Sequence, residues 1–193
     1  MRRFVCATAG ALAAVLCLPA CTPLAAVAPA TIAARTRAPA FELGGRISAS
    51  DGQQAASGRI EWQHDPASER ITLLTPLGQV AARLDANALG ARLETADGQL
   101  QTADSAAALL PRVLGVDVPV ERLGGWVQAA PDSAAEVRTR DAAGRPALVI
   151  DQGWRIDYLD YSSDAADAPP ARLDISRGDA RIRLLIDAWT TLP

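Results

Sequence analysis

The sequence predicts a mainly β fold with short helices, an α+β domain in which antiparallel strands form most of the structure. From residue 41 onward, apolar and polar residues alternate in most segments, which is the period of a strand with one buried face. Short turn sequences containing glycine, proline, aspartate or asparagine separate these segments and favour hairpins. Residues 104–127 change to helical spacing. Together these observations indicate an antiparallel sheet with a small helical insertion.

The clearest hairpin lies at residues 71–84. Its centre is Thr75-Pro76-Leu77-Gly78, with proline second and glycine fourth, the arrangement of a type I turn. Leu77 therefore falls near the apex, where a polar or small residue is usual. Two interpretations stay open at this point: Leu77 is exposed at the tip for a functional reason, or it folds back onto the core.

The same alternation predicts further strands along the rest of the chain. The sequence shows neither an internal repeat nor a second domain, and an acidic loop ending in proline occupies residues 162–170. The predicted strands are residues 41–48, 57–64, 91–96, 147–151, 154–161, 172–176 and 180–187.

Two short helices are expected between the two halves of the sheet. Asp104 or Ser105 can cap the first helix, Gly115 can end it, and Pro111 should kink it or confine it to two short pieces. Pro119 suits the first turn of the second helix. Such helices either cover the sheet as a lid or simply close an ordinary core. The apolar face of the second helix consists of Leu123, Trp126 and Val127.

Composition indicates a single domain and argues against a nucleic-acid-binding protein. The chain has 193 residues and a formal net charge of −3, and its arginines are scattered rather than clustered. Its cysteines, Cys6, Cys17 and Cys21, all lie at the front. Removal of the chain before Cys21 leaves one thiol and therefore no intramolecular disulfide, so the fold must be held by packing.

The amino terminus has the features of a lipoprotein signal peptide. Arg2 and Arg3 precede an apolar run at residues 4–18, which is too short and too rich in alanine for a convincing membrane span. The sequence LPAC at residues 18–21 then resembles the lipobox of bacterial lipoproteins. That resemblance implies acylation of Cys21, and several acyl chains anchor a protein far more firmly than one.

We expect three regions: a signal peptide at 1–20, a lipidated N-terminus and tether at 21–40, and one folded domain at 41–193. The tether is rich in alanine, proline and threonine and lacks periodicity. The residue after Cys21 is Thr22 instead of aspartate, and this resembles the sorting signal of lipoproteins that go to the outer membrane. An ordinary signal peptide cleaved near residues 28–30 is the alternative, and it would give a soluble secreted protein.

Catalytic patterns are sparse, so we expect neither an enzyme nor a cofactor. His64 is the lone histidine, and no Cys/His metal-ligand spacing, nucleophile elbow or glycine-rich phosphate loop occurs. A hydrolase that uses paired carboxylates stays open as a minor alternative. The carboxylates expected on solvated faces and in turns are Glu61, Asp151, Asp157 and Asp160.

Several further stretches are informative when taken together in chain order. They are GRIS at 45–48, GRIEW at 58–62, residues 73–78 ending in PLG, LG at 114–115, VP at 118–119, Leu123 with Trp126, QGWRI at 152–156 with Tyr158, and residues 181–189. This ordered set resembles the LolB family, the outer-membrane acceptor of the bacterial lipoprotein-sorting (Lol) pathway. One departure follows Trp126, where a glycine often seen in the family is replaced by Gln-Ala-Ala at 128–130, and it bears on how the helix ends.

The resemblance implies a half-open antiparallel β-barrel with a helical lid over an apolar cavity. It implies a protein that accepts mature lipoproteins from a soluble LolA-like periplasmic carrier and inserts them into the inner leaflet of the outer membrane. The expected partners are therefore the carrier, the lipoprotein cargo and outer-membrane lipid, and we expect a lipid-anchored monomer on the periplasmic face.

Two groups of residues are candidates for this function. The first is the membrane-delivery loop Pro76, Leu77 and Gly78, where the resemblance favours the exposed form of Leu77. The runner-up function is a structural or assembly lipoprotein that binds a protein partner, and it would have a filled core instead of a cavity. The acyl-chain cavity candidates are Ile60, Trp62, Leu73, Leu84, Leu93, Leu110, Leu114, Trp126, Ile156, Tyr158, Leu184 and Ile186.

Overall fold

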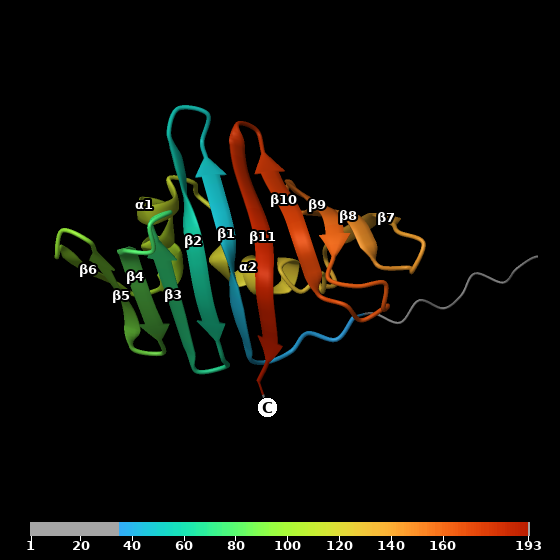
Figure 1. Cartoon of the computed structure of the whole chain (residues 1–193), viewed down its shortest axis with the longest axis horizontal. Helices are drawn as coiled ribbons and strands as arrows, with labels where there is room; N and C mark the ends of the chain where they lie inside the picture. The colour runs from blue at the N-terminus through green and yellow to red at the C-terminus, as the bar shows by residue number, and fades with distance from the viewer. Residues whose placement is uncertain (1–34, 193) are drawn as a thin grey trace, which may run out of the picture. The chain divides into compact units, whose positions relative to one another are not determined.

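The computed structural model describes residues 35–192, and it consists of one antiparallel sheet with short helices on one face. Figure 1 shows the helices behind the sheet in that view, on the same side of it. The prediction of a mainly β fold with short helices is therefore confirmed. The predicted signal peptide and most of the predicted tether, including Cys21, lie outside the described residues.

Eleven strands form the sheet in the order β6-β5-β4-β3-β2-β1-β11-β10-β9-β8-β7. Within residues 35–192 the edges β6 and β7 do not pair with each other, so the sheet is not closed and the barrel is not confirmed. The strands are β1 Phe41–Ser50, β2 Ala55–His64, β3 Ser68–Leu74, β4 Val80–Asn87, β5 Gly90–Thr95, β6 Leu100–Ala103, β7 Glu136–Arg140, β8 Pro146–Asp151, β9 Trp154–Tyr161, β10 Pro170–Arg177 and β11 Ala180–Thr191.

The centre of the sheet joins the two ends of the domain, because β1 pairs with both β2 and β11. Gly45 of β1 lies opposite Ile60 on one side and Ile186 on the other, beside a bulge between Gly44 and Gly45. A Cβ atom at residue 45 would collide with the carbonyl oxygen of Leu185. The close approach of β11 therefore requires glycine at this position.

Proline and glycine divide the helical insertion as the sequence predicts. A 3-10 turn, η1 Ala106–Ala108, precedes α1 Leu110–Leu114, and Pro111 occupies the first turn of α1, where its missing N–H does no harm. Gly115 ends α1 in the left-handed conformation, with φ at +70°. The second helix, α2 Val120–Trp126, begins after Pro119, which is its N-cap instead of a member of the first turn.

The helix α2 ends at the Gln-Ala-Ala segment, where the sequence departs from the family pattern. The N–H of Ala130 donates to the carbonyl of Gly125 at 2.9 Å, which closes the helix end, and Ala129 between them has φ at +50°. A left-handed backbone suits glycine and costs other residues about 1 kcal/mol. The chain therefore keeps the glycine-type helix exit with an alanine in the strained position.

Two sequence-based expectations differ from the structure. The short edge strand β6 was not predicted, because none of its four residues is buried and its one large apolar side chain, Leu100, is exposed. Residues 35–40, which we placed in the tether, lie against the domain through hydrogen bonds of Arg35 and Arg37.

Candidate functional site

A small enclosed space lies between the sheet and the helices, within the main hydrophobic core. Its volume is about 30 Å³, and every residue that lines it is apolar. A cavity needs about 10–15 Å³ of such space to hold one water molecule, so this interior is nearly filled and is too small for an acyl chain. Five of the predicted cavity residues surround it: Ile60, Trp62, Leu110, Leu114 and Leu184.

The other predicted cavity residues lie near this space without lining it. Leu73 is half-buried and lines a neighbouring groove. Alternation correctly finds buried positions but does not tell which of them border a void. The remaining six are buried in the same core: Leu84, Leu93, Trp126, Ile156, Tyr158 and Ile186. Residues that we did not select also line the space, namely Ile47, Ile71, Leu123, Val127, Ile175 and Ile182.

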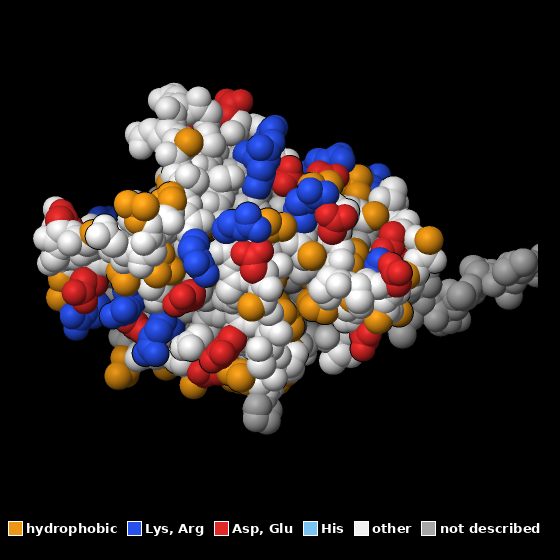
Figure 2. Space-filling model, in the orientation of Figure 1, with side chains coloured by type: hydrophobic (Ala, Val, Ile, Leu, Met, Phe, Trp, Pro, Cys, Tyr) orange, Lys and Arg blue, Asp and Glu red, His pale blue; other side chains and the backbone are white. Residues whose placement is uncertain are grey.

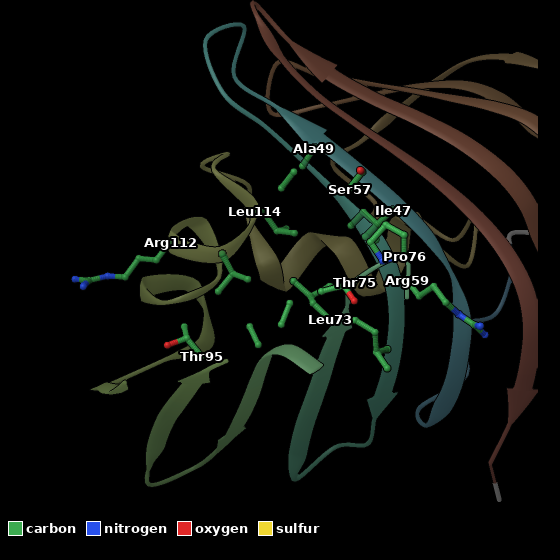
Figure 3. Close-up of a pocket in the computed structure, with 16 residues that line it drawn as sticks. Ile47, Ala49, Ser57, Arg59, Leu73, Thr75, Pro76, Thr95, Arg112 and Leu114 are labelled. Atoms are coloured by element: carbon green, nitrogen blue, oxygen red, sulfur yellow. The ribbon is translucent and has the colours of Figure 1, made fainter. Parts of the chain in front are cut away.

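An open groove of about 330 Å³ adjoins the enclosed space. Figure 3 shows its walls, with Ala49 and Ser57 on the first hairpin, Leu73 and Pro76 beside the β3–β4 turn, and Leu114 on α1. Ile47 and Leu114 line both the groove and the enclosed space. These two side chains therefore separate the outer groove from the interior.

The β3–β4 turn presents Leu77 to solvent. The N–H of Gly78 donates to the carbonyl of Thr75 and the N–H of Thr75 donates to the carbonyl of Gln79, both at 2.8 Å. These bonds hold a tight turn in which Leu77 is 90% exposed, with exposed Val80 after it. Leu77 therefore does not fold back onto the core, which resolves the two interpretations of its position.

The second helix is fastened to the sheet by a buried carboxylate. Asp151, at the end of β8, is 1% exposed and accepts hydrogen bonds from Nε1 of Trp126 at 2.9 Å and from Arg122 at 3.1 Å. Our expectation that Asp151 lies on a solvated face or in an exposed turn is wrong, because α2 covers it. Glu61 and Asp160 are exposed as expected.

Two further contacts hold the C-terminal end of α2. The hydroxyl of Tyr158 donates to the carbonyl of Trp126 at 2.9 Å, and burial raises the pKa of this phenol, which keeps it protonated as a donor. Arg37 donates to the carbonyl of Ala130 at 2.9 Å and pairs with Asp132 at 2.7 Å. The segment before β1 thus acts as a strap across the helix exit.

The first helix is held much more loosely. Within residues 35–192, the side chains of α1 make one hydrogen bond to the sheet, from Arg112 to Gln101 at 2.8 Å. Otherwise α1 rests on apolar contacts of Leu110 and Leu114, with half-buried Val113 beside them. The two helices therefore differ in how firmly they are attached, although both cover the same face of the sheet.

A metal centre and a helical membrane span are not found in the part of the chain that the structure describes. There, no three His, Cys, Asp or Glu side chains gather as a metal site, and no helix has the length and apolar character to cross a membrane. The lone histidine, His64, stacks on Phe41 with ring centroids 5.1 Å apart. Its position is that of a packing residue beside the core.

Comparisons with known proteins identify the family. The family model described as "Outer membrane lipoprotein LolB" matches residues 39–189. An outer-membrane lipoprotein LolB from Azoarcus sp. (strain BH72) is 63% identical over 152 residues, which cover 79% of each chain. One from Thiobacillus denitrificans is 37% identical over 157 residues, which cover 81% of this chain and 83% of the relative.

A solved structure shows a more distant likeness. The crystal structure of a LolA superfamily protein from Nitrosomonas europaea aligns with 83% of this chain and 89% of its own, at 9% identity and a TM-score of 0.47. That likeness is too weak to support an argument alone. The family match and the two relatives are sufficient, and the chain therefore belongs to the LolB family of outer-membrane lipoproteins.

Proposed function

We propose that this protein accepts mature lipoproteins from a LolA-like periplasmic carrier and inserts them into the inner leaflet of the outer membrane. The observation that carries the proposal is that a largely apolar open groove adjoins an enclosed apolar space, with Ile47 and Leu114 lining both. Acyl chains of the cargo would occupy both spaces once these side chains move. Contacts of this kind need no catalytic step and no cofactor.

The physical need for such a site follows from the cost of exposing acyl chains to water. Each CH₂ group gains about 0.8 kcal/mol on burial, so a chain of many carbons cannot leave a membrane unprotected. An all-apolar wall binds it without directional bonds that must be broken at release. A bilayer can then compete for the same chain with the same kind of interaction.

The proposal requires movement, and α1 is the element that moves. It has one side-chain hydrogen bond to the sheet, whereas a buried carboxylate and the strap fasten α2. Gly115 at the end of α1 has φ at +70°, and a Cβ there would meet nothing within 4 Å, so this joint has room to turn. Outward rotation of α1 would withdraw Leu110 and Leu114 and open the interior to the groove.

The proposed anchor and the exposed turn would together position the protein for delivery. Acylated Cys21 and the tether would hold a monomeric domain at the periplasmic face of the outer membrane. The loop Pro76, Leu77 and Gly78 would contact the leaflet that receives the cargo. The turn rises directly beside the open groove, since Pro76 lines that groove, so chains leaving it emerge next to Leu77.

A structural or assembly role is the second candidate, and the nearly filled core favours it. An interior space of about 30 Å³ is what a protein without an acyl-chain cavity would have. In that case the exposed turn would bind a protein partner. The two candidates therefore differ in whether the interior opens.

Transfer of labelled cargo tests the proposal. The purified carrier, loaded with a radiolabelled triacylated lipoprotein, is mixed with proteoliposomes that hold this protein, and bare liposomes serve as the control. Movement of label from the carrier into the proteoliposomes alone is the expected result. Label that stays on the carrier while this protein is folded would favour the structural role.

A further inference from the structure

We propose that the tip of this domain binds the anionic headgroups of membrane phospholipids through Arg59 and Arg112, which flank the exposed Leu77. We call Leu77, Val80, Arg59 and Arg112 the docking tip. The inference rests on the proposed function, because it specifies which bilayer surface the delivery loop contacts. Its occupant is a bilayer with phosphodiester headgroups of net negative charge.

The fold brings the two arginines to opposite sides of the turn. Arg59 of β2 pairs in register with Leu74, the last residue of β3 before the turn. Arg112 comes from α1, and both arginines line the open groove together with Pro76. Figure 3 shows the two side chains extending in opposite directions, away from the groove. The apolar tip therefore has a cation on each side.

Neither guanidinium has an acidic partner among the residues that the structure describes. No carboxylate there lies within 4 Å of Arg59 or Arg112, and Arg112 donates to the neutral side chain of Gln101. Some arginines of the sheet are neutralised, as Arg46 is by Asp187 at 3.0 Å, whereas others, such as Arg83 of β4 and Arg181 of β11, also have no carboxylate within 4 Å in the described part of the chain. Figure 2 shows acidic and basic side chains interspersed over the face of the sheet. What distinguishes the tip is that two such arginines line one groove beside a turn with an exposed leucine.

One carboxylate lies near the tip and reduces its charge without cancelling it. Asp97 is in the β5–β6 turn, which bonds to the neighbouring strand through the N–H of Ala96 and the carbonyl of Ala81. The hydroxyl of Thr95 and the N–H of Gln99 lower the pKa of Asp97, so it is ionised at neutral pH. Arg46 and, to a lesser extent, Arg59 lower the pKa of Asp187, but Arg46 already neutralises this second carboxylate. Arg59 and Arg112 against Asp97 therefore still leave net positive charge beside the turn.

This combination matches the physical requirements for binding an anionic bilayer. An exposed apolar side chain gains free energy in the acyl region, and basic residues near the surface are attracted to anionic lipid within a Debye length, about 8 Å at physiological salt. Each arginine should contribute about fivefold to affinity for anionic vesicles. The two arginines together should contribute about 25-fold at low salt.

The experiment follows the tip itself. The chain from residue 21 onward carries Gln79→Cys with an environment-sensitive dye, and Cys21→Ser removes the acyl anchor that would otherwise insert the protein into every vesicle. The same chain without Gln79→Cys gives the background. The emission spectrum of the dye is recorded while vesicles are added. One set of vesicles contains phosphatidylcholine alone, and in the other set part of the phosphatidylcholine is replaced by phosphatidylglycerol. Both titrations are carried out at low and at high salt.

The expected result is a blue shift that saturates at about 25-fold lower lipid when phosphatidylglycerol is present and that high salt weakens. Arg59→Gln with Arg112→Gln should remove that preference, whereas Arg59→Lys with Arg112→Lys should keep most of it. Arg140→Gln, a change of an exposed arginine on edge strand β7, is the matched control. If the glutamine variant does not fold, the parent chain tests the inference instead, because its preference for phosphatidylglycerol should weaken at high salt.

An equal shift with both vesicle types, or no shift with either, would overturn the inference. Cargo transfer by the parent chain into phosphatidylcholine proteoliposomes is measured in parallel. Continued transfer by a parent chain whose tip shows no preference for phosphatidylglycerol would refute the headgroup contact alone. Loss of transfer by the parent chain would instead refute the proposed function.

Discussion

The indole N–H of Trp126 donates to the buried carboxylate of Asp151 at 2.9 Å and thereby joins α2 to the turn between β8 and β9. Arg122 supplies the opposite charge at 3.1 Å, so the carboxylate is both paired and hydrogen-bonded. Burial without these partners would be costly. This arrangement fixes α2 to the sheet, whereas α1 is held mainly by apolar contacts.

Removing this carboxylate should destabilise the domain strongly. We expect Asp151→Ala to lower the free energy of unfolding by about 3 kcal/mol, because it leaves the indole N–H of Trp126 unpaired and Arg122 without its buried partner. Urea unfolding measures the change. Asp160→Ala, which breaks the exposed pair with Arg172, should cost less than about 1 kcal/mol. Equal losses in both variants would contradict the role given to Asp151.

A charge at the tip should stop delivery without harming the fold. Leu77→Glu should change the free energy of unfolding by less than about 0.5 kcal/mol, since Leu77 is 90% exposed, yet the carboxylate cannot enter a bilayer. Labelled cargo should then remain on the carrier or on this protein. The matched control is Leu89→Glu in the β4–β5 turn, where the leucine is 98% exposed at the other end of the hairpin. Normal delivery of cargo by the Leu77→Glu variant would contradict the role proposed for Leu77.

Locking α1 should block acceptance of cargo. Replacing Arg112 and Gln101, whose side chains are joined by a hydrogen bond of 2.8 Å, with cysteines allows a short bifunctional thiol reagent to tie α1 to β6. We expect the locked protein to take up almost no label, because Leu114 then stays between groove and interior. The same double variant treated with a reagent that reacts at one end only controls for the substitutions. Undiminished uptake by the locked form would show that α1 need not move.

Acid should weaken the fold through aspartates that are hydrogen-bonded in turns. The hydroxyl of Ser68 and the N–H of Ala67 lower the pKa of Asp65 below its usual value near 3.8. A carboxyl whose folded pKa is depressed stabilises the protein above its unfolded pKa, and this contribution disappears as the pH falls through the folded pKa. The free energy of unfolding of Asp65→Asn should therefore depend less on pH below about 4 than that of the parent chain. Parallel curves from urea unfolding across this range would contradict the prediction.

Sequence reasoning succeeds where the information is local. Alternation around Ile60 and Trp62 correctly predicts a strand with one buried face, and Pro111 correctly predicts a divided helix. The turn at Thr75 likewise follows from proline and glycine at defined positions. Each of these features depends on residues close together in the chain.

The errors arise where distant segments meet. Asp151 precedes a Gln-Gly turn and so reads as exposed, but α2, 25 residues earlier at Trp126, covers it. Arg35 bonds to a carbonyl 133 residues away at Ala168, which no local pattern of the tether indicates. The boundary of the interior space is missed for the same reason, since alternation reveals which side of a strand is buried but not what packs opposite it.

The position of β11 in the middle of the sheet has a consequence for how the domain folds. Gly45 and Ile186 are partners, so the central ladder closes a loop that spans most of the folded chain. Contacts between residues so far apart in sequence slow folding, because the entropy of loop closure is lost before the pairing is gained. Until residues 180–191 take their place, the edges of β1 and β10 stay unpaired and able to recruit other strands. During synthesis the last strand thus completes the centre of the sheet, and the unfinished chain needs protection from aggregation until it arrives.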